Sequence, residues 1–277
     1  MKTLNYLHIP KCGGQGFKNL IPILEDKGLK VFSRTTTPFE GYDKYSFVHT
    51  HYGSDPSDNY PEIETACIFR DPLDRMVSQF AWAMMTDAYS YPVFSEYTKD
   101  NIETLFKHFL FNDENFVNNN NLQTKFVCNR VDKGHFYLMH IGRMTPDGGP
   151  VQHEIPYSHG IFAKEWSLLN DKTSIEYAKS QVDKMVIIDT LENHDRFTTN
   201  VCNWFKDNYD LDIEEEFRAS LVNENPTFNY SIFTDNQGNE WTTAKLKALL
   251  TEEEIARVYE NNSLDLELYN YVKDKVQ

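Results

Sequence analysis

Short apolar segments typical of β-strands alternate with amphipathic segments typical of helices over most of this 277-residue chain. The expected strands lie at residues 3–9, 45–51, 65–70 and 186–189. Parallel strands cannot be joined by a tight turn, so a strand–helix alternation favours parallel strands connected by crossover helices. We therefore expect an α/β fold with a central, mostly parallel β-sheet flanked by helices on both faces. No repeat or linker interrupts the chain, which predicts a single domain over residues 1–277.

Three of the expected helices are marked at their first turn. Asp71 can cap a helix whose first residue is Pro72, where proline is well tolerated. Two later segments carry the capping-box pattern of a threonine followed three residues on by a glutamate, namely Thr173 with Glu176 and Thr251 with Glu254.

The charge balance limits the partners of the protein. The 27 Lys and Arg residues against 42 Asp and Glu residues give a net charge of −15, which disfavours nucleic acid and anionic membranes as partners. An anionic ligand therefore needs a local basic site. The four cysteines are widely spaced and form no C-x-x-C pair, and no apolar stretch reaches the length of a membrane span or a signal peptide. These features predict a cytoplasmic protein.

The segment LHIPKCGGQGF, residues 7–17, places a lysine and three glycines directly after the first expected strand. A glycine-rich loop between a strand and a helix presents backbone N–H groups to an anion, and Lys11 adds a positive charge. The lysine precedes the glycines, so the order differs from a Walker A loop. A glycine-rich turn with an exposed lysine is the alternative interpretation.

The segment FRDPLDRMVSQF places Arg70 at the carboxyl end of an expected strand, where open α/β sheets bind ligands. In the helix that follows, Asp71, Arg75 and Ser78 share one face. The alternative is a surface helix with an Asp71–Arg75 ion pair, which leaves Arg70 without a role.

The segment FVHTHYG contains His49 and His51, which point to the same side of an extended strand. A metal-binding pair is one alternative, although the sequence offers no identifiable third ligand. Two core histidines are the other.

PKCGGQG and RDPLDRMVS, in this order, resemble two motifs of the sulfotransferases that use 3′-phosphoadenosine 5′-phosphosulfate (PAPS). The two histidines resemble those of the heparan-sulfate 2-O-sulfotransferase branch. NLQTKFVC (residues 121–128) and the carboxyl-terminal LTEEEIARVYENNSLDLELY resemble further segments of the family, but the resemblance is strong only over residues 5–80. It implies a P-loop-like three-layer sandwich that binds PAPS and releases PAP.

The resemblance also implies site residues. The loop that holds the 5′-phosphosulfate would comprise Lys11, Cys12, Gly13, Gly14, Gln15, Gly16 and Phe17. The 3′-phosphate would be bound by Arg70 and Ser78. The family has hydroxyl residues where this chain has Gln15 and Gly16, and threonine where it has Cys12. Binding would therefore depend more on backbone N–H groups and Lys11.

In the implied mechanism, His51 is the catalytic base and Lys11 stabilises the charge that develops on the bridging oxygen. His49 would orient His51 or contact the acceptor. The reaction requires no metal. The net charge of −15 favours a smaller or less charged acceptor over a heavily sulfated polysaccharide. We expect a carbohydrate or a small molecule, sulfated on a hydroxyl or an amine, while a lipid and a peptide remain open alternatives. A P-loop-type kinase and a non-catalytic nucleotide-binding module are the competing interpretations.

Overall fold

The computed structural model describes residues 2–14, 16–34, 44–50, 63–85, 101–111, 120–128, 172–222 and 232–277. At its centre is a sheet of five strands in the order β2-β3-β1-β4-β5, with every neighbouring pair parallel. The strands are β1 (Thr3–Leu7), β2 (Val31–Arg34), β3 (Phe47–Thr50), β4 (Ile63–Phe69) and β5 (Ile187–Thr190). The predicted α/β architecture with a mostly parallel sheet is confirmed.

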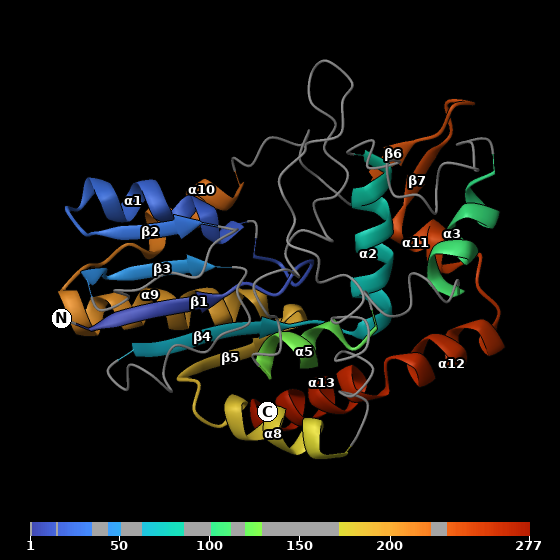
Figure 1. Ribbon diagram of the computed structural model, residues 1–277. Helices are drawn as coiled ribbons and strands as arrows, with labels where there is room; N and C mark the ends of the chain where they lie inside the picture. Colours follow the sequence, from blue (N-terminus) through green and yellow to red (C-terminus); the bar gives the residue numbers. More distant parts are fainter. Residues whose placement is uncertain are drawn as a thin grey trace, which may run out of the picture.

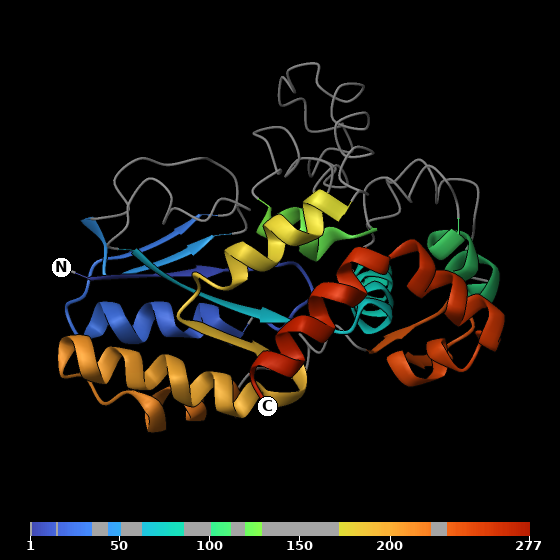
Figure 2. The ribbon, with the colours of Figure 1, turned by 90° about the horizontal axis from the view of Figure 1, so that it is seen from below.

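Helices cover both faces of this sheet (Figures 1 and 2). On one face lie α1 (Leu20–Asp26) and α9 (His194–Tyr209), with α10 (Glu214–Val222) beside them. Towards β4 and β5 on the other face lie α5 (Leu122–Val127), α8 (Lys172–Val182) and α13 (Ser263–Lys275). Side chains of these helices and of the sheet form one continuous hydrophobic core.

A second hydrophobic core lies beyond the carboxyl ends of the strands, on the right of Figure 1. It is built from helices α2 (Pro72–Met85), α3 (Ile102–Phe111), α11 (Thr243–Lys247) and α12 (Glu252–Asn261), together with an antiparallel hairpin of β6 (Ile232–Thr234) and β7 (Glu240–Thr242). Helix α2 begins directly after β4, so it connects the sheet to this second core.

Two of the predicted helix starts are confirmed. Helix α2 begins at Pro72, and the Asp71 carboxylate accepts a hydrogen bond from the backbone N–H of Asp74 at 3.1 Å. Thr251 and Glu254 form the predicted capping box at the start of α12, with bonds of 2.8 and 3.2 Å.

One other predicted helix start was wrong. Helix α8 begins at Lys172, so Thr173 lies inside the first turn and not before it. After the glycine-rich loop the chain forms the 3₁₀ helix η1 (Gly16–Asn19), and α1 follows from Leu20. Near the carboxyl end, Asn262 separates α12 from α13.

The topology brings together the two strand–helix junctions that the sequence analysis singled out. Because β1 and β4 are parallel neighbours, both end at the same edge of the sheet. The glycine-rich loop leaves β1 there, and Arg70 follows β4 there. None of the helices formed by the described residues combines the length and the apolar character needed to cross a bilayer.

Candidate functional site

The loop after β1 has an unusual backbone. Lys11 has φ = 68° and Gly13 has φ = 84°, so both lie in the left-handed region. That conformation costs a residue with a side chain about 1–2 kcal/mol, whereas glycine adopts it freely. The strain at Lys11 is therefore held by the surrounding packing, as is common at functional sites.

Close packing explains two of the glycines. A Cβ atom at Gly14 would lie 2.0 Å from Cδ2 of His8, and one at Gly13 would lie 2.5 Å from Cδ1 of Leu191. Both glycines therefore let the loop lie directly against its neighbours, and no side chain fits at either position without movement.

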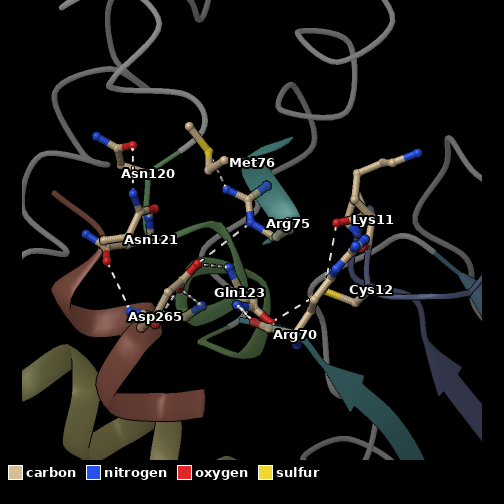
Figure 3. Close-up of polar contacts among 12 residues, drawn as sticks. Lys11, Cys12, Arg70, Arg75, Met76, Asn120, Asn121, Gln123 and Asp265 are labelled. Carbon is tan, nitrogen blue, oxygen red and sulfur yellow. Dashed lines mark hydrogen bonds and ion pairs between the residues drawn. The ribbon is translucent and has the colours of Figure 1, made fainter. Parts of the chain in front are cut away.

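Arg70 reaches the loop from the end of β4. Its Nη1 donates a hydrogen bond of 3.0 Å to the backbone carbonyl of Lys11 (Figure 3). Arg70 is half-buried, and this bond uses one of the five N–H donors of its guanidinium. The two segments that the sequence singled out thus meet through a direct contact.

Several charged side chains act on the buried Cys12 next to this contact. The buried thiol of Cys12 has a pKa raised by burial to about 12, and the charges of Arg75, Arg70 and Lys11 oppose that rise while Asp265 adds to it. These groups therefore all lie within electrostatic reach of one thiol. A group of cations of this kind can attract an anion although the overall charge is −15.

The lysines of the site are poorly solvated. Burial, followed by repulsion from Arg70, lowers the pKa of Lys11 to about 7. The Lys11 ammonium also lies over the ring of Trp82, 5.8 Å from its centroid. Lys125 in α5 is 3% exposed, and burial lowers its pKa to about 7 although Asp265 opposes the shift. A bound anion would stabilise the charged form of Lys11.

Arg75 is a core residue, so the surface-helix alternative is wrong. Its side chain is fully buried, and its Nε lies 4.0 Å from a carboxylate oxygen of Asp265, which is fully buried as well. Asp71 instead caps α2 and accepts a hydrogen bond of 3.0 Å from the hydroxyl of Tyr259.

His49 lies in β3 with no exposed surface. Its ring stacks on Tyr6 with 5.5 Å between centroids, lies 5.1 Å from the ring of His8, and has Nδ1 3.4 Å from the hydroxyl of Ser33. Burial and the nearby charge of Lys18 lower the pKa of His49 to about 4, against the opposing effect of the Gly14 carbonyl. His49 is therefore neutral at physiological pH and packs next to the loop.

The remaining predicted residues occupy different environments. Cys12 and Phe17 are fully buried, and the Phe17 ring stacks on Tyr6 at 4.6 Å, so Phe17 can serve a ligand only through its backbone. Gly16 is the buried first residue of η1. Ser78 is 6% exposed in α2. His51 and Gln15 lie outside the described residues.

Sequence reasoning missed three residues of this region, His8, Gln123 and Asp265. His8 directly follows β1 and stands two residues after Tyr6, a spacing that places both side chains on the same side of an extended segment. Gln123 and Asp265 belong to the two later segments that resemble the family, but those segments had received no role. In the part of the chain that the structure describes, no three His, Cys, Asp or Glu side chains gather where they could hold a metal ion.

No protein-family model matches this chain, and the search of curated proteins finds no match.

Proposed function

We propose that the protein is a PAPS-dependent sulfotransferase, which transfers a sulfuryl group to an acceptor hydroxyl or amine. The observation that carries this proposal is the hydrogen bond between the guanidinium of Arg70 and the carbonyl of Lys11, 3.0 Å long. This bond brings together the two segments that resemble the family's phosphosulfate and 3′-phosphate motifs. A ligand with two anionic ends, such as PAPS, needs both segments close to each other.

In the proposed reaction, the acceptor oxygen or nitrogen attacks the sulfur of PAPS in line with the leaving group. The bond from sulfur to the bridging oxygen breaks, and that oxygen keeps the electron pair as PAP leaves. The acceptor proton passes to His51, because an imidazole is a suitable base near neutral pH. The Lys11 ammonium stabilises the charge that develops on the leaving oxygen. Arg70 and Ser78 hold the 3′-phosphate and orient the donor.

The surroundings of His49 support different roles for His49 and His51. His49 is fully buried, and its depressed pKa of about 4 makes it a weak base. We therefore assign to His49 the support of the glycine-rich loop, and to His51 the proton transfer.

A kinase is supported less well. A magnesium-dependent phosphoryl transferase needs an acidic side chain at the end of a central strand. The acidic side chain of Asp189 lies near the end of β5, but β5 is an edge strand of the described sheet, and Arg196 binds this carboxylate through two hydrogen bonds of 2.7 and 2.9 Å. The carboxylate is thus already neutralised by a side chain of the protein.

The test is the transfer of label from radioactive PAPS to a panel of carbohydrates and small alcohols and amines. We expect transfer by the wild type, loss of transfer in His51→Ala with PAP binding retained, and unchanged transfer in His108→Ala, a control histidine in α3. Full activity of His51→Ala would show that another group, such as a carboxylate, is the base. PAP binding without transfer to any acceptor would favour the non-catalytic module.

A further inference from the structure

The side chain of Gln123 forms hydrogen bonds with both backbone groups of Arg70, its carbonyl and its N–H. Its side-chain Nε2 donates to the Arg70 carbonyl at 2.8 Å, and its Oε1 accepts from the Arg70 N–H at 2.9 Å. Gln123 is fully buried in α5. A primary amide is suited to this contact because it carries a donor and an acceptor on one planar group.

The same amide reaches the glycine-rich loop. The thiol of Cys12 donates to Oε1 of Gln123 at 3.4 Å, and burial keeps that thiol protonated. One side chain therefore contacts the segment after β1 and the segment after β4 (Figure 3). These are the two segments that would bind the two ends of the nucleotide.

Gln123 is itself held by the start of α13. The carboxylate of Asp265 accepts from the backbone N–H of Gln123 at 3.1 Å, and from the N–H and hydroxyl of Thr124 at 2.8 and 2.9 Å. In return, the side-chain oxygen of Asn121 accepts from the N–H groups of Leu264 and Asp265 at 3.0 and 3.1 Å. The first turns of α5 and α13 thus cap each other, and this fixes the position of the Gln123 side chain.

We propose that Gln123 is a positioning residue for the 3′-phosphate site, acting through Arg70 without touching the ligand. This inference rests on the proposed function. The guanidinium of Arg70 can meet a phosphate at a fixed place only if the backbone that carries it is fixed, and in β4 the ladder of hydrogen bonds ends one residue earlier, at Phe69. Gln123 supplies the bonds that the strand no longer supplies.

The test compares the binding of PAP and of AMP, which lacks the 3′-phosphate, by calorimetry. Gln123→Met keeps the size of the side chain and removes both bonds to Arg70. Because both bonds that fix the Arg70 backbone are lost, we expect PAP to bind about tenfold more weakly or worse, and AMP to lose no more than about threefold. Gln181→Met, at a buried glutamine of α8, is the matched control and should leave both affinities unchanged.

A second measurement tests the contact itself. In the wild type, the backbone amide of Arg70 should be protected from hydrogen exchange, and Gln123→Met should remove this protection while the amides of β1 keep theirs. If Gln123→Met does not fold, Gln123→Glu replaces it, because it keeps the acceptor for Arg70 and loses only the donor.

The outcomes separate this inference from the proposed function. A wild type that does not bind PAP overturns both. A wild type that binds PAP, with a folded Gln123 variant that binds PAP equally well, overturns the inference alone. Equal weakening of PAP and AMP also overturns it, because a general loss of structure would not distinguish the 3′-phosphate.

Discussion

The buried carboxylate of Asp265 offers the sharpest test of how the site is held together. Asp265→Ala removes the acceptor of three hydrogen bonds, from the N–H groups of Gln123 and Thr124 and from the Thr124 hydroxyl. It also removes the counter-ion of Arg75, whose side chain is fully buried 4.0 Å away.

The expected cost is dominated by Arg75. Removing one partner of a buried ion pair typically costs about 3–5 kcal/mol, because the other charge remains buried without compensation. We expect Asp265→Ala to lower the free energy of unfolding by about 4 kcal/mol. For a chain of this size such a loss lowers the thermal midpoint by roughly 10 °C.

The assay is urea unfolding followed by circular dichroism, with calorimetry for the midpoint. The matched control is Asp183→Ala, which removes a half-exposed carboxylate that pairs with Lys275 of α13 and should cost no more than about 1 kcal/mol. In a double variant, Arg75→Met with Asp265→Asn, the unpaired charge is absent, so it should be more stable than Asp265→Asn alone. A cost of less than about 1 kcal/mol for Asp265→Ala would refute the reasoning.

Three further predictions follow from the site. Gly14→Ala would place a Cβ atom 2.0 Å from the His8 ring, so PAP affinity measured by calorimetry should fall at least about tenfold. The control Gly28→Ala, whose Cβ would meet nothing within 4 Å, should cost only about 1 kcal/mol of stability and leave PAP affinity unchanged. Equal PAP affinities for both variants would contradict this prediction. The pKa of Lys11 is lowered to about 7, and an anion binds the ammonium form of this lysine. PAP affinity should therefore fall by up to about tenfold per pH unit above pH 7 in the wild type, and Lys11→Met should lack this pH dependence. An identical pH profile in Lys11→Met would contradict the assignment. Lys125 has a pKa of about 7 in the folded state, below its value in the unfolded state, so the unfolded chain binds more protons above pH 7. The free energy of unfolding should therefore rise from pH 7 towards pH 10. Lys125→Met should be more stable than the wild type at pH 7 and should show a smaller rise of this free energy, and a urea midpoint equal to that of the wild type at both pH values would contradict the prediction.

The sheet was predictable because its two longest strands, β1 and β4, are mostly apolar, as is typical of strands buried on both faces. All five residues of β1 and six of the seven in β4 are buried. β2 was missed because Val31–Arg34 is short and half polar. The hairpin of β6 and β7 was missed because its strands have only three residues each.

The contact between Arg70 and the loop after β1 depends on the order of the strands in the sheet. Two segments that leave neighbouring parallel strands must lie side by side, and β1 and β4 are neighbours. The sequence itself indicated no strand order, so this contact was implied only by the resemblance, which assigns both segments to one ligand.

The support of this contact could not be predicted in the same way. Helical periodicity places Asp71 and Arg75 on one face and suggests a local ion pair, but the tertiary structure buries Arg75 against Asp265. Gln123 contacts Arg70 across 53 positions of the chain. No local periodicity reports such contacts, because they depend on how distant helices pack.

The central claim is that the loop after β1 and Arg70 together form a site for PAP. Parallel calorimetric titrations of the wild type with PAP and with ATP, without and with magnesium, test it most directly. We predict that PAP binds at least about tenfold more tightly than ATP under both conditions, and that Arg70→Met removes this preference. Tighter binding of ATP, or a preference for PAP that survives in Arg70→Met, would contradict the account.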